Sequence, residues 1–135
     1  MPRLAVLIVA LLLALPASAP AKGGGGGGGG GGDDNRQEVR VGGTCGHGAT
    51  ARLRLRSRDG AIRVQFEVDH TRSRVTWRVS IVQERRVAWR GRARTSARQF
   101  ELEYRLNDLP GADRVNVRAV APHGLTCVAV ATLPG

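Results

Sequence analysis

The sequence predicts an all-β protein: a single antiparallel β-sandwich of about seven strands, closed by one disulfide. Three observations predict this fold. Apolar and polar residues alternate along a series of short segments, which is the period of strands with one buried and one solvated face. Turn-forming residues separate these segments at intervals of about twelve residues, as in sandwich domains. Two cysteines, Cys45 and Cys127, bracket almost the whole alternating region.

The first 21 residues have the three parts of an export signal. Arg3 provides a positive charge, residues 4–15 form an unbroken apolar run, and small residues follow. The run is shorter than the ~20 residues that a membrane-spanning helix needs, so we expect cleavage and secretion rather than anchoring. Cleavage is expected after Ala19 or Ala21, and a proline directly after Ala19 favours Ala21.

A glycine-rich linker is predicted over residues 22–38, with consecutive glycines at 23–32. Glycine has no side chain to bury and loses the most backbone entropy on ordering, so we expect this segment to be disordered. Two interpretations remain open: a tether that gives the domain reach, or a neutral repeat expansion. The remaining residues, 39–135, form one predicted domain.

The first two strands are predicted over residues 52–56 and 62–68, on either side of an Asp-Gly pair at residues 59–60. An Asp-Gly pair between alternating segments is a strong signal for a tight hairpin. The third strand is predicted over residues 75–81, with Trp77 on its inward face.

The fourth strand is predicted over residues 87–94, with Val87, Trp89 and Gly91 facing inward and arginines facing outward. A basic helix over residues 83–98 is the alternative. The alternation fits a strand better than a helical stripe, and glycine weakens a helix.

The last three strands are predicted over residues 100–106, 115–119 and 125–133. Residues 107–113 contain a Pro-Gly pair and are predicted to form a loop.

Cysteine usage predicts a disulfide between Cys45 and Cys127, because exported proteins fold in an oxidising environment. On the chain-entropy account, closing a loop of this length stabilises the fold by roughly 4.5 kcal/mol. The alternative is a zinc site made of both cysteines with His47 and His123, which lie near them in the sequence. His70 is interpreted as a turn residue, and we expect no metal site and no cofactor.

Several short stretches carry a resemblance to known proteins. They are Gly-Thr-Cys at 43–45, Ala-Arg-Leu-Arg-Leu at 51–55, Asp-Gly at 59–60, Val-Gln-Phe-Glu-Val-Asp at 64–69, Trp-Arg-Val at 77–79 and Leu-Thr-Cys at 125–127. In this order they resemble small secreted Ig-like or fibronectin-III-like β-sandwich proteins of high-GC actinobacteria. The resemblance implies the fold and a secreted location, but no activity and no catalytic residue. The cysteines depart from the antibody pattern, in which the bridge joins the second and sixth strands.

Charge is the second informative property. The chain has 21 Lys and Arg residues against 11 Asp and Glu residues, a formal net charge of +10, and all but one of the basic residues are arginines. Two groups of three alternate arginines stand out; we call Arg52, Arg54 and Arg56 the first arginine comb, and Arg90, Arg92 and Arg94 the second arginine comb. Arginine binds phosphate and carboxylate bidentately, so each comb is a candidate polyanion-binding site. The alternative explanation is compositional, since GC-rich coding favours arginine and solvated strand faces need charge.

The aromatic residues are expected in the core rather than on a nucleic-acid-binding surface, because all of them fall on predicted inward faces. Nucleophilic-serine motifs are absent from the sequence, and no histidine has an evident catalytic partner. We therefore expect a protein that is not an enzyme.

The sequence thus favours a secreted, noncatalytic module that binds an anionic cell-wall polymer or another polyanion through its arginines. The alternative is a secreted protein-interaction domain, such as an inhibitor or a subunit, that uses the loop at residues 107–113 and has no polyanion specificity.

Overall fold

The structure, a computed structural model, describes residues 37–135. The predicted signal peptide, residues 1–21, lies outside the described residues, as do residues 22–36 of the predicted linker. Glu38, which the sequence placed in the linker, begins the first strand.

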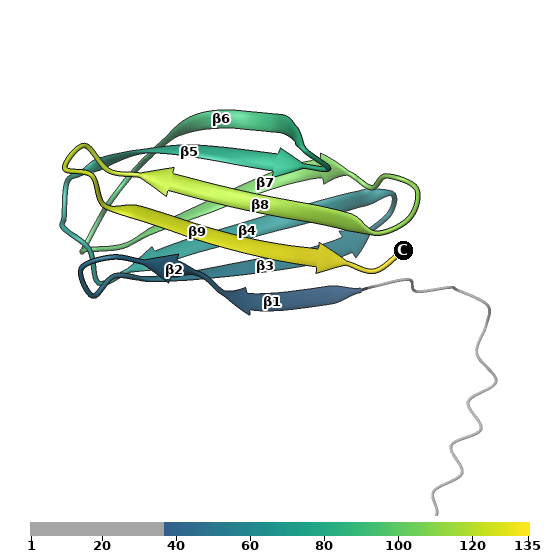
Figure 1. Ribbon diagram of the computed structural model, residues 1–135, viewed down its shortest axis with the longest axis horizontal. Helices are drawn as coiled ribbons and strands as arrows, with labels where there is room; N and C mark the ends of the chain where they lie inside the picture. Colours follow the sequence, from purple (N-terminus) through teal and green to yellow (C-terminus); the bar gives the residue numbers. More distant parts are fainter. Residues whose placement is uncertain (1–36) are drawn as a thin grey trace, which may run out of the picture. The chain divides into compact units, whose positions relative to one another are not determined.

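Nine strands form two antiparallel sheets in the described part of the chain (Figure 1). The four-stranded sheet has the order β1 (Glu38–Gly42), β3 (Thr50–Arg58), β4 (Ala61–Asp69) and β7 (Phe100–Asn107). The five-stranded sheet has the order β2 (Thr44–Cys45), β9 (Thr126–Leu133), β8 (Asp113–Val120), β5 (Thr76–Gln83) and β6 (Arg86–Arg94).

The chain alternates between hairpins within one sheet and connections from one sheet to the other. Strands β3 and β4, β5 and β6, and β8 and β9 pair as consecutive neighbours, whereas the β4–β5, β6–β7 and β7–β8 connections change sheets. The predicted all-β sandwich is therefore confirmed, and its seven predicted strands correspond to β3 to β9. The helical alternative for residues 83–98 is wrong, because β6 occupies this segment.

The core lies between the sheets and contains the aromatic residues that the alternation placed inside. Phe100 joins the two layers, with its ring centroid 5.5 Å from that of Trp77 and 6.1 Å from that of Phe66. Trp89 and Tyr104 are half-buried, with ring centroids 5.4 Å apart, and connect β6 to β7. Burial of large apolar side chains provides most of the free energy that stabilises such a fold.

Cys45 and Cys127 form the predicted disulfide, with an S–S distance of 2.03 Å. They face each other in the antiparallel pair of β2 and β9, with their Cα atoms 4.2 Å apart. The bridge therefore joins two neighbouring strands of one sheet, although the cysteines are 82 positions apart in the sequence. The zinc alternative is wrong, because both sulfurs are bonded to each other.

The predicted orientation of Val87 is wrong. The pairing of β5 with β6 shifts register between Ile81 and Val82, so that Ile81 faces Trp89 whereas Val82 faces Val87. Such a bulge reverses the alternation beyond it. Val87 consequently lies on the outer face and is 50% exposed. Trp89 and Gly91 face inward as predicted, and the Trp89 ring lies against Gly91, where a Cβ atom would collide with it.

Candidate anion-binding surface

The two arginine combs lie on different sheets. The first, Arg52, Arg54 and Arg56, is on β3 of the four-stranded sheet, and the second, Arg90, Arg92 and Arg94, is on β6 of the five-stranded sheet. Each set alternates with inward-facing residues and therefore projects from the outer face of its own sheet. The structure does not bring the combs together into one surface.

Carboxylates neutralise the first arginine comb. The Arg52 Nη2 atom lies 2.8 Å from Glu67 Oε1 and 3.5 Å from Asp69 Oδ2. Arg54 and Arg56 both donate to Glu38 Oε2, at 2.9 and 2.7 Å. These groups form ion pairs with one another, so few of their charges remain for an external anion.

Glu38 holds three arginine side chains at the edge of this sheet. Hydrogen bonds from Arg54, Arg56 and Arg40, in that order of effect, lower the pKa of its carboxyl group from 4.5 to about 2. The carboxylate form is favoured because each guanidinium donates to it. Sequence reasoning missed this role, since Glu38 stood at the end of a segment read as linker.

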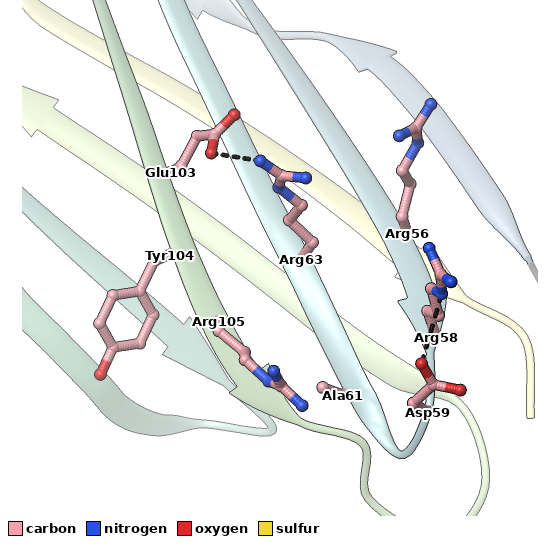
Figure 2. A pocket seen from close by; sticks show the side chains of 8 residues that line it. All are labelled: Arg56, Arg58, Asp59, Ala61, Arg63, Glu103, Tyr104 and Arg105. Atoms are coloured by element: carbon pink, nitrogen blue, oxygen red, sulfur yellow. Dashed lines mark hydrogen bonds and ion pairs between the residues drawn. The ribbon is translucent and has the colours of Figure 1, made fainter.

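A hollow of about 460 Å³ on the same sheet gathers four arginines of β3, β4 and β7, yet it is also mixed in charge (Figure 2). Arg63 donates to Glu103 at 2.6 Å, and Arg58 lies 3.3 Å from Asp59. Arg56 is held by Glu38. The charges in this hollow are therefore largely paired within the sheet.

The second arginine comb has the opposite surroundings. Its neighbours across the sheet include two more arginines: Arg78 of β5 faces Arg92, and Arg118 of β8 faces Ser80, which faces Arg90. These five residues form what we call the arginine face: Arg78, Arg90, Arg92, Arg94 and Arg118. All five are exposed.

The arginine face has no carboxylate beside it. Among the described residues, none of its arginines forms an ion pair. Within the strands of the five-stranded sheet, the only acidic residue is Asp113, and its side chain is buried. The direct pairing of Arg78 with Arg92 sets like charges opposite each other, which destabilises a sheet. The protein thus keeps unneutralised positive charge on one face and mostly paired charge on the other.

Arg78 and Arg118 were missing from the sequence-based site. Each occupies an outward position in a predicted strand, so a signal for exposure was present. What was missing was the strand order, because only the pairing of β5 with both β6 and β8 places these residues beside the second comb.

No group of three or more His, Cys, Asp or Glu residues is placed to hold a metal ion in the part of the chain that the structure describes. Residues 37–135 also contain no helix long and apolar enough to cross a membrane. Compared with protein-family models, curated proteins and solved structures, the chain matches none of them.

Proposed function

We propose that this protein is a secreted, noncatalytic β-sandwich module that binds anionic polymers of the cell exterior through its arginine face. One observation carries the proposal: the five arginines of this face are exposed and lack carboxylate partners among the described residues, whereas most arginines of the opposite sheet are ion-paired. Charge that served only solubility would not need to be segregated in this way.

The arrangement suits a repeating ligand better than a single small one. Neighbouring strands are about 4.8 Å apart, and alternate residues on a strand are about 6.7 Å apart. The five guanidinium groups therefore form a grid that extends over three strands, β6, β5 and β8. Each can donate two parallel hydrogen bonds to a phosphate, sulfate or carboxylate group.

The test compares two triple variants with the same loss of charge. Arg78, Arg92 and Arg118 are changed to Gln in one, and Arg52, Arg56 and Arg63 are changed to Gln in the other as the matched control. Binding of each to long-chain polyphosphate, single-stranded DNA and isolated cell wall is measured over a range of salt concentrations around 0.15 M.

We expect the arginine-face variant to lose most of its affinity and the control to retain it. For single-stranded DNA, the slope of log K against log salt should become shallower by about 2, since each lost phosphate contact removes about 0.7. Equal weakening in the two variants would show that net charge alone attracts the polymer, and the proposal would then be wrong.

The exposed loop at residues 108–112 supports the protein-interaction alternative, whereas the ends of the predicted loop, Asn107 and Asp113, belong to β7 and β8. It presents Leu109, which is 39% exposed, beside Pro110. If the arginine-face variant binds all three polyanions like the unmodified protein, a Leu109→Asp variant becomes the informative one, with capture of an extracellular protein partner as the readout.

A further inference from the structure

All three histidines of the chain line one hollow at the end of the sandwich, although they are far apart in the sequence. The hollow has a volume of about 620 Å³. It is formed by the β2–β3, β4–β5, β6–β7 and β8–β9 connections. We call it the histidine pocket, and the residues that matter for its chemistry are His47, His70, Thr71, Arg72, Arg98 and His123.

Hydrogen bonds hold the wall of this pocket in place. The Thr71 amide donates to the Arg98 carbonyl at 3.1 Å, and Arg98 Nε donates back to the Thr71 carbonyl at 3.0 Å. The buried Thr95 hydroxyl donates to the Arg72 carbonyl at 2.6 Å. Arg98 thereby keeps its terminal guanidinium nitrogens available, since no other described residue accepts from them. The Arg98 guanidinium is therefore held in place before any ligand arrives, which lowers the cost of binding.

The disulfide brings two of the histidines to the same end of the molecule. Cys45 is paired with Cys127, and the connections that carry His47 and His123 leave the sheet close to this bridge. Because His47 and His123 lie near the cysteines, the sequence suggests them as zinc ligands. Their place in one pocket follows instead from the disulfide, which joins the strands next to them.

One buried polar group in the pocket has no partner. Thr71 is only 4% exposed, and its hydroxyl oxygen Oγ1 makes no hydrogen bond within the described structure. Nearly all buried polar atoms in proteins are hydrogen-bonded, and leaving one unpaired costs free energy. Because this oxygen is itself shielded from solvent, it pairs with an anion in the hollow only when the Thr71 side chain turns toward the ligand.

We infer that the histidine pocket binds a compact oxyanion, such as inorganic phosphate or the terminal group of a phosphate monoester. The lining combines two guanidinium groups, imidazole nitrogens that can donate, and the unpaired Thr71 hydroxyl. Two arginines repel a metal cation, and no described group of His, Cys, Asp or Glu is placed to hold one. The inference does not rest on the proposed function, because none of the arginine-face residues lines this pocket.

The experiment titrates the purified, disulfide-bonded protein with inorganic phosphate and, separately, with Zn²⁺, using calorimetry and NMR of the imidazole groups. Thr71→Val removes the hydroxyl with little change in shape, and Thr132→Val at the exposed end of β9 is its control. Arg72→Gln removes an exposed charge from the pocket, and Arg85→Gln removes one from the β5–β6 turn as its control.

We expect saturable phosphate binding that Thr71→Val and Arg72→Gln each weaken about tenfold or more, since hydrogen bonds to charged groups are among the stronger ones. Without phosphate, Thr71→Val should melt at a higher temperature than the unmodified protein, because a methyl group replaces an unsatisfied hydroxyl. The controls, and the variant with Arg78, Arg92 and Arg118 changed to Gln, should bind phosphate normally. Unchanged binding in both pocket variants, or Zn²⁺ binding to the histidines without phosphate binding, would overturn the inference.

Discussion

At the scale of single residues, the most unusual group in the fold is Asp113, a carboxyl group that is 1% exposed at the start of β8. Gln83 Nε2 donates to it at 2.8 Å and also donates to the Asn107 carbonyl at 2.8 Å. Burial is the main cause that raises the pKa of Asp113, and a hydrogen bond with Asp108 adds to it. Gln83 thus holds together Asn107 and Asp113, the residues on either side of the loop at residues 108–112.

Replacing Asp113 by Asn should stabilise the protein at neutral pH by about 1 kcal/mol, because the desolvated charge disappears while the acceptor for Gln83 remains. Because the pKa of Asp113 is raised, the protonated carboxyl group stabilises the folded protein at low pH. This stabilisation is lost as the pH rises from about 3.9, the pKa in the unfolded chain, through the higher pKa in the folded protein. The advantage of the Asn variant should therefore shrink or vanish near pH 3. Urea unfolding at several pH values tests this, and a variant less stable than wild type at neutral pH would contradict it.

At the scale of elements, three tight turns that close antiparallel pairs have two successive residues with positive φ, the backbone of hairpins that match strand twist; a fourth turn, at His47 and Gly48, has the same backbone between the two sheets. Asp59 and Gly60 have φ values of 52° and 72°, Glu84 and Arg85 of 47° and 68°, and Ala97 and Arg98 of 49° and 66°. The first turn was clear from the sequence because it carries the residues that tolerate this conformation. The turn at Ala97 and Arg98 contains no glycine, asparagine or aspartate, so the local sequence did not predict its positive φ values.

Arg85→Gly should stabilise the fold by about 0.5–1 kcal/mol. A left-handed conformation costs an L-residue about 1–2 kcal/mol, and the greater flexibility of glycine in the unfolded chain offsets part of the gain. Arg86→Gly is the matched control: it removes the same charge one residue later, in β6 and without a positive φ, and should destabilise. Thermal unfolding of the two variants decides the point, and a decrease in stability for Arg85→Gly would refute the strain argument.

The β6 strand shows where alternation alone stops being informative. The pattern predicted the strand and the inward positions of Trp89 and Gly91, but it placed Val87 on the wrong face. The pairing of β6 with β5 shifts register between Ile81 and Val82. The sequence of β6 alone gives no sign of this shift, because it depends on the partner strand. For the same reason β1 was missed: its two valines form too short a pattern, and it becomes a strand by pairing with β3.

At the scale of the whole molecule, the sequence predicted both the sandwich and the disulfide, yet it did not predict which arginines are free. All arginines look equivalent in a sequence. Their separation into a paired set and an unpaired set depends on which strands are neighbours, because Glu38, Glu67 and Glu103 all belong to the four-stranded sheet. The arginine face is therefore a consequence of strand order.

The disulfide gives a prediction that separates stability from binding. Changing both Cys45 and Cys127 to Ala should lower the free energy of unfolding by up to about 4.5 kcal/mol, because an unfolded chain without the cross-link gains conformational entropy. Below the unfolding transition, polyanion binding should persist, since the arginine face lies on β5, β6 and β8. Phosphate binding should weaken, because the connections that carry His47 and His123 are no longer tied together. Denaturant unfolding and the two binding assays on this one variant measure all three effects. Loss of polyanion binding with phosphate binding retained would show that the two sites have been assigned to the wrong parts of the fold.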